Sequence, residues 1–204
     1  MKKLLAALFV LCLMASPLAS LAAASDGQGS PLDVFSVGMS KADAAKKGAV
    51  KTDNPDALFA TLSQDGTDWR TILNFKNDKT VSIGLSTDVK NPLVAQLLED
   101  MESRGYLPIG IERGKSVNVY KSPSKDAFGI LNEELNAYAG QDTGEITVLF
   151  GSGPLFETLA KATSDEEEDA ALTRYNDAVA YAMHIGKDDD KLTVVIATVG
   201  TLGQ

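Results

Sequence analysis

The chain has 204 residues, of which 44% are hydrophobic and 23% charged, a balance typical of a folded domain. Asp and Glu outnumber Lys and Arg by 28 to 19, so no basic surplus is present to neutralise phosphates, and nucleic-acid binding is excluded as a main function. One Cys and one His exclude a disulfide framework and most His/Cys metal sites. We therefore expect no metal and no cofactor.

The first 24 residues have the order of a bacterial secretory signal peptide. Lys2 and Lys3 precede an apolar run from Leu4 to Ala15, and small residues follow at 22–24. We expect cleavage after Ala24, with Ala22 as the alternative. The apolar run of about 12 residues is short for a membrane span, which needs about 20. Bulky residues precede Cys12, which argues against a lipid anchor.

The mature protein is therefore expected to be periplasmic or secreted, without a stable membrane anchor. Removal of Lys2 and Lys3 changes the formal charge from −9 to −11, and removal of Cys12 leaves no thiol. Residues 25–35 contain Gly and Ser and are interpreted as a flexible leader. No Pro- or Gly-rich linker interrupts the rest, so residues 36–204 are predicted to form a single domain.

The first half of this domain favours strands. Ser40 and Asp43 form a capping-box-like start of a short helix that ends at Gly48. A third strand over 58–62 precedes two alternating runs, 69–75 and 81–85, that are joined by a polar turn at 76–79. This pattern is typical of an antiparallel hairpin.

Helices and strands alternate irregularly in the second half. A helix is predicted to begin at Asn91, as its cap, and to end at Gly105. Residues 106–112 and 116–120 are predicted to form a hairpin. A second helix is predicted over 124–139 and a further strand over 146–150. Another helical region starts at Pro154. The spacing of Leu172, Tyr175, Val179 and Ala182 predicts a longer helix that ends at Gly186, and a last strand covers 192–198. The fold class is α+β, with a mostly antiparallel sheet packed by amphipathic helices.

Two short motifs and two single residues are candidates for catalytic or ligand-binding elements. Ser122 and Lys125 have the S-x-x-K spacing of penicillin-recognising serine enzymes, but no K-T-G strand follows, and we interpret Ser122 as a helix cap. Gly114-Lys115-Ser116 resembles the end of a phosphate loop, yet a β-forming segment follows, so a hairpin turn is favoured. His184 is interpreted as a helix-end residue and Trp69 as core. No catalytic residue is assigned.

One acidic run is the candidate interaction patch: Asp165, Glu166, Glu167, Glu168 and Asp169. Ser164 would cap a helix there, and carboxylates in a first turn are favoured by the helix dipole. The simpler interpretation is therefore a solvated helix start. The functional interpretation is a surface that steers a basic partner or weakly holds Ca²⁺.

The segment Ser36-Val37-Gly38-Met39-Ser40-Lys41-Ala42-Asp43, with the strands that follow it to residue 86, resembles the opening of a family of small bacterial envelope domains. Domains of this type occur in the lipoprotein of the outer-membrane assembly machine and in the β-lactamase inhibitor protein. The family's pattern is a glycine, an apolar residue, Ser or Thr and an acidic residue on a short helix, before antiparallel strands. The resemblance implies a non-catalytic scaffold that presents a sheet face to another protein.

These observations favour an exported envelope protein that acts as a non-catalytic interaction module, with an envelope protein as its possible partner. Two alternatives stay open. One is a small-molecule or ion-binding protein with a pocket between the sheet and the helix at Leu93–Met101. The other is a hydrolase that uses carboxylates or Ser122. An exposed apolar patch would favour the interaction module. An enclosed pocket would favour the small-molecule or ion-binding protein, and converging ionisable groups in a cleft would favour the hydrolase.

Overall fold

The computed structural model describes residues 25–26, 30–123 and 126–203, so the predicted signal peptide lies outside the described residues. The fold is a single α+β domain, as predicted. The strands are β1 (Ser25–Asp26), β2 (Val50–Lys51), β3 (Ala57–Gln64), β4 (Thr67–Lys76), β5 (Lys79–Asp88), β6 (Tyr106–Glu112), β7 (Ser116–Asn118), β8 (Glu145–Ser152), β9 (Val179–Gly186) and β10 (Lys191–Thr198). The helices are α2 (Lys41–Lys46), α3 (Asn91–Ser103), α4 (Ala127–Ala139), α5 (Gly153–Lys161), α6 (Asp165–Arg174) and α7 (Val199–Leu202), with 3-10 turns η1 (Pro31–Asp33) and η2 (Val119–Lys121).

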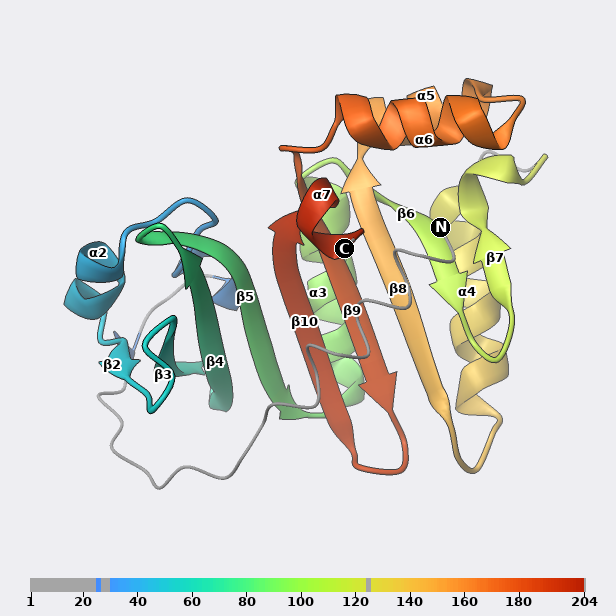
Figure 1. Cartoon of the computed structure of the whole chain (residues 1–204). Coiled ribbons are helices and arrows are strands. Elements are labelled where there is room, and N and C mark those ends of the chain that lie inside the picture. The colour runs from blue at the N-terminus through green and yellow to red at the C-terminus, as the bar shows by residue number, and fades with distance from the viewer. Residues whose placement is uncertain (1–24, 27–29, 124–125, 204) are drawn as a thin grey trace.

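All strands belong to one sheet in the order β1-β3-β4-β5-β10-β9-β8-β6-β7, and β2 pairs with β3. Every pairing is antiparallel except that of β1 with β3. The last strand in the sequence, β10, joins the first hairpins to the second half of the sheet, as Figure 1 shows. This central position ties both halves of the chain into one domain.

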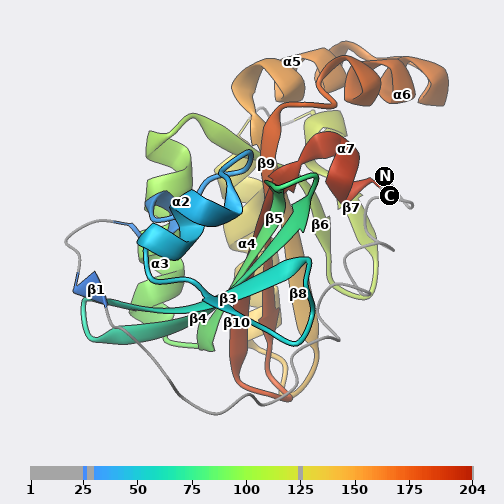
Figure 2. The ribbon, with the colours of Figure 1, turned by 60° about the vertical axis from the view of Figure 1, so that its left-hand side comes forward.

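One face of the sheet carries the main hydrophobic core. Helices α3 and α4 lie behind the sheet in Figure 1, and Figure 2 shows them on one side of it. Leu97 and Met101 of α3 and Leu131 of α4 are buried in this core together with alternate residues of the strands, such as Leu73 and Val194. We call this side the helix-packed face.

The opposite side, which we call the open face, is covered at one end. Helix α5 packs on β6 and β8, and α7 packs on β9 and β10. Leu155 and Val199 of these helices bury Leu149 and Ala197 in a second, smaller core. In Figure 1 no helix of the described chain lies in front of β3, β4 or β5.

Local sequence signals explain most element boundaries. The Ser40 hydroxyl accepts a hydrogen bond from the amide of Asp43 and caps α2, as predicted. Ser164 caps α6 in the same way. Asn77 and Asp78 have φ values of 52° and 62°, and this left-handed pair forms the tight turn between β4 and β5.

The predicted long helix that ends at Gly186 is wrong. Helix α6 stops at Arg174, and residues 179–186 form the interior strand β9. Tyr181, Met183 and Ile185 pack into the main core, whereas Ala180 and Ala182 face the second core. Because both faces of β9 are buried over most of its length, its apolar residues occupy consecutive positions and mimic a helical stripe.

The predicted flexible leader is corrected for residues 30–35. Ser30 caps η1, and Leu32 and Phe35 are buried members of the main core. Asp33 forms a bidentate ion pair with Arg104 at the end of α3 (2.6 and 2.8 Å). This segment is thus part of the domain, and β1 before it pairs with β3.

Two predicted caps are also corrected. Asp126, and not Ser122, caps α4 by accepting a hydrogen bond from the Gly129 amide at 2.8 Å. Lys90 occupies the cap position of α3, and Asn91 is the first helical residue. Within the described ranges, no helix has the length and apolar character needed to cross a bilayer.

Candidate interaction surface

The register of the strands places two rows of side chains across the open face. Residues directly opposite each other in an antiparallel pair project to the same side of the sheet. One row is apolar and runs Val50, Phe59, Ile72, Gly84, Val195, Ala182 and Leu149. The neighbouring row is polar and runs Thr61, Arg70, Ser86, Thr193, His184 and Thr147.

The apolar row changes in burial along its length. Val195, Ala182 and Leu149 belong to the second core beneath α5 and α7. Phe59 and Ile72 are half-buried and belong to neither core, and Val50 has 45% of its surface exposed. Among the described residues, Val50 is the only large hydrophobic residue in the exposed class. The free end of this row therefore presents apolar side chains that the described elements do not cover.

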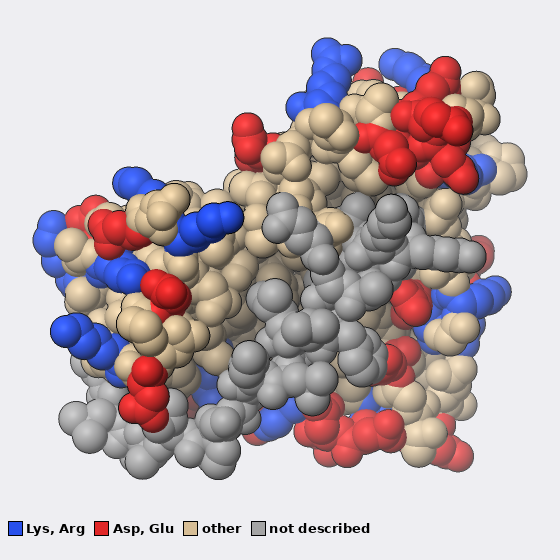
Figure 3. Space-filling model, in the orientation of Figure 1, with Lys and Arg blue, Asp and Glu red and all other residues tan. Residues whose placement is uncertain are grey.

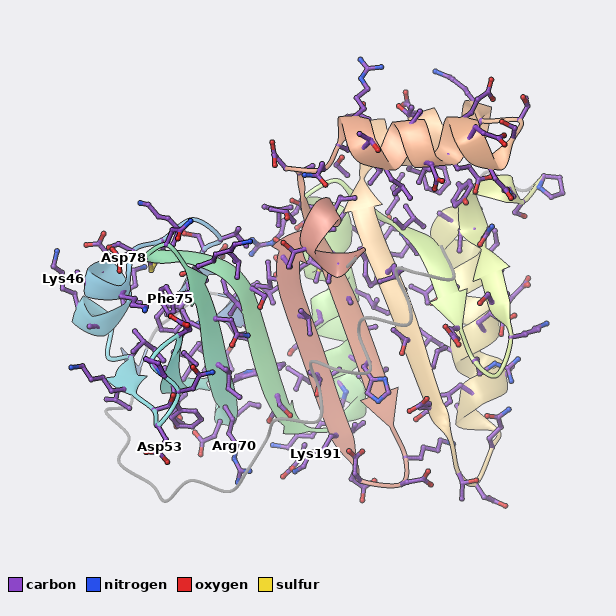
Figure 4. The ribbon with its side chains drawn as sticks, in the orientation of Figure 1. Lys46, Asp53, Arg70, Phe75, Asp78 and Lys191 are labelled. Carbon is purple, nitrogen blue, oxygen red and sulfur yellow. The ribbon has the colours of Figure 1, made fainter. Side chains whose placement is uncertain are left out.

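Hydrogen bonds between strands order the polar side chains. Thr193 donates to the Ser86 hydroxyl at 3.4 Å, and Asn74 donates to Ser82 at 3.0 Å on the other side of the apolar row. Arg70 is exposed and forms no ion pair with another described residue. In Figure 4 it stands at the lower end of β4, to the left of Lys191 on β10.

His184 lies in the polar row, on strand β9, and not at a helix end, which corrects the prediction. Its Nδ1 is 3.0 Å from the Thr147 hydroxyl, and its Nε2 is 3.7 Å from Glu145 Oε2. This trio brings together a hydroxyl, an imidazole and a carboxylate, the groups of a hydrolase triad. However, Thr147 lies in strand β8, which is paired on both sides, so its backbone amides are committed to the sheet and do not form an oxyanion hole.

The acidic run occupies the first turns of α6, over the end of the sheet (Figure 3, upper right). Asp165, Glu166, Glu167 and Asp169 are exposed, and Glu168 is buried. The Glu167 carboxylate accepts hydrogen bonds from the amide and the hydroxyl of Thr163 at 2.6 and 2.9 Å. These bonds hold the pKa of Glu167 below its ordinary value.

Glu168 fastens α6 to the rest of the molecule. Tyr120 donates a hydrogen bond to its carboxylate at 2.9 Å, and Lys121 forms an ion pair with it. Burial raises the pKa of Glu168, but the bonds from Lys121 and Tyr120 outweigh burial and hold it below the ordinary value. Burial and this carboxylate raise the pKa of Tyr120. The predicted patch is therefore four exposed carboxylates and one structural carboxylate.

The other residues singled out in the sequence have structural positions. Trp69 is core, as predicted, with 1% of its surface exposed. Gly114 lies in the turn of the β6–β7 hairpin, which confirms the hairpin interpretation. Leu97 and Met101 of α3 fill the main core. Lys125, and with it the complete S-x-x-K motif, lies outside the described residues.

Comparisons with known proteins add no family. No family model, no curated protein and no solved structure matches the chain. Over the part of the chain that the structure describes, no group of three or more His, Cys, Asp or Glu side chains could hold a metal ion. The open face is therefore the candidate functional site on its geometry alone.

Proposed function

We propose that this is an exported envelope protein, periplasmic or secreted, which acts as a non-catalytic module and binds a partner protein on the open face of its sheet. The observation that carries the proposal is the uncovered end of the apolar row, where Phe59 and Ile72 have the polar row on one side and Ala57 and Asn74 on the other. An apolar centre with a polar surround is the usual composition of a protein interface. The resemblance of residues 36–86 to envelope domains that present a sheet face agrees with this proposal.

Affinity capture from envelope extract with the mature chain tests the partner. We expect a protein that is retained by the wild type and lost with Ile72→Asp, which places a charge in the apolar row. Glu133→Gln, on the exposed surface of α4, is the matched control and should retain the partner. Equal retention by all three proteins would show that the partner binds elsewhere. Circular dichroism checks that Ile72→Asp is folded.

Export is tested independently by the intact mass of the protein recovered outside the cytoplasm. The proposal expects the mass of residues 25–204, with cleavage after Ala24. A protein that keeps Met1–Ala24, or one that carries a lipid on Cys12, would contradict it.

A further inference from the structure

Gly84 lies in the interior of β5, in the apolar row between Ile72 and Val195. Glycine weakens a strand because it loses more conformational freedom on folding than other residues and has no side chain to pack. Within a strand it usually marks a bulge, a strained backbone or a place where another group approaches closely.

Neither a left-handed backbone nor a steric contact with the described chain requires a glycine here. The φ angle of Gly84 lies outside the left-handed region, and its register is regular on both sides. A Cβ built at Gly84 meets nothing within 4 Å. By contrast, a Cβ at Gly151 would lie 2.9 Å from Leu155, and one at Gly186 would lie 2.5 Å from Asp189. Gly84 therefore leaves a notch in the surface that the described chain does not fill.

Apolar residues flank the notch along the apolar row, and polar or charged residues lie on its two other sides. Ile72 and Val195 flank it along the apolar row, and Asn74 and Ser82 are hydrogen-bonded to each other on one side. On the other side lie Ser86 and Arg70, which are paired across β5 and β4. The two carboxylates on neighbouring positions are engaged, because Asp88 pairs with Lys191 and Asp68 accepts the Ser63 hydroxyl. Among the described residues Arg70 forms no ion pair, although it lies near enough to Asp88 to help lower the pKa of that carboxyl.

We propose that the notch over Gly84 receives an apolar side chain of a partner protein, and that Arg70 pairs with a carboxylate next to that side chain. This inference rests on the proposed function and names the chemistry of the partner: an apolar residue within one or two positions of an Asp or Glu. The fit follows from charge complementarity with Arg70 and from the missing Cβ. A guanidinium is well suited to bind a carboxylate in a bidentate manner.

Selection of peptides from a random phage-displayed library tests the proposal with the mature protein. The library is selected on the wild type and depleted on Gly84→Val, in which a branched side chain fills the notch. We expect the recovered peptides to combine an apolar residue with a neighbouring Asp or Glu. Their affinity should fall by about ten-fold or more with Gly84→Val and with Arg70→Gln. Lys46→Gln, in an exposed ion pair on α2, is the control and should leave binding unchanged.

The melting temperature of Gly84→Val separates a binding role from a structural one. Since a Cβ at this position meets no described atom and valine favours strands, we expect the variant to melt at the wild-type temperature or higher. A lower melting temperature would show that Gly84 serves the fold and would overturn the proposal. Recovery of no peptide that distinguishes the two proteins, or of peptides without acidic enrichment, would also overturn it. Partner capture that depends on Ile72 but not on Gly84 would leave the proposed function intact.

Discussion

A buried carboxylate at the start of a helix stabilises the fold as long as it is ionised and paired. Glu168 accepts a hydrogen bond from Tyr120 and pairs with Lys121. We expect Glu168→Ala to lower the free energy of unfolding by about 2 kcal/mol at pH 7, because it leaves the Tyr120 hydroxyl without this acceptor. Glu168→Gln keeps an acceptor and should cost about 1 kcal/mol. Urea denaturation measures both, and exposed Asp169→Asn is the control, with an expected change below about 0.5 kcal/mol.

The contacts of the Glu168 carboxylate with Lys121 and Tyr120 predict that the stability of the protein depends on pH. The pKa of Glu168 is lower in the folded protein than its ordinary value of 4.5. The stabilisation is therefore complete above that value and is lost as the pH falls through the folded-state pKa. The difference in stability between the wild type and Glu168→Gln should shrink between pH 7 and about pH 3. A difference that stays constant over this range would contradict the assigned ionisation.

Asp190, in the turn between β9 and β10, has a left-handed φ of 52°. A residue with a Cβ pays for this conformation, whereas glycine adopts it freely. We expect Asp190→Gly to raise the free energy of unfolding by up to about 1 kcal/mol, measured by thermal or urea denaturation. Asp190→Asn removes the same charge but keeps the Cβ. An equal gain from Asp190→Asn would assign the effect to charge repulsion with Asp188 and Asp189 and not to the backbone.

At the scale of elements, Arg104 joins the 30–35 segment to α3. It bonds Asp33 through both terminal nitrogens and Asp100 through Nε at 2.7 Å. We expect Arg104→Met and Asp33→Asn to be coupled by about 1 kcal/mol in a double-mutant cycle, since a bidentate pair exceeds an ordinary surface ion pair. The exposed Lys46–Asp43 pair is the control and should show weaker coupling. Independent effects of the two substitutions would mean that the Arg104–Asp33 pair does not hold the segment, which would leave this role to the buried Leu32 and Phe35 and to the hydrogen bonds of Ser30 and Val34.

Sequence periodicity identified the strands that have one buried face but failed for β9, whereas β8 and β10, which are also buried on both faces over most of their length, were predicted correctly as strands. Alternation over 69–75 and 81–85 predicted β4 and β5 correctly, because each turns one side to the core. Strand β9 is buried on both sides over most of its length, so its pattern contains no clear period. The β-branched and aromatic residues Val179, Tyr181 and Ile185 were the signal available for a strand.

The candidate surface depends on strand order, which local sequence patterns do not contain. Phe59, Ile72 and Gly84 lie in segments that were predicted as strands, but their alignment with Val195 requires β10 to pair with β5. His184 and Thr147 meet for the same reason, through the pairing of β8 with β9. The acidic run, a local feature, was located correctly at the start of α6, whereas the burial of Glu168 follows from its tertiary contact with Tyr120.

At the scale of the whole molecule, charge is distributed unevenly. Residues 164–190 contain nine acidic side chains against Arg174 and Lys187, whereas residues 41–51 contain four lysines against Asp43. Figure 3 shows acidic side chains gathered over α6 and along the lower edge of the molecule, whereas basic and acidic side chains are mixed near α2. A protein with this distribution has a strong field that orients charged partners at low salt and weakens as salt is added.

Among the described residues these carboxylates nevertheless form no group of three or more that could hold a metal ion. Ca²⁺ needs six to eight oxygen ligands that converge on one point. Glu168 points into its contacts with Tyr120 and Lys121, and Glu167 is held by Thr163. We expect calorimetric titration of the mature protein with Ca²⁺ to show no micromolar binding.

Any association of a basic protein through this surface should disappear by about 0.5 M salt, where the screening length shortens to a few Å. Micromolar calcium affinity, or salt-resistant binding that is abolished by neutralising Glu166 and Glu167, would contradict a solvated helix start and assign the acidic run a specific ligand.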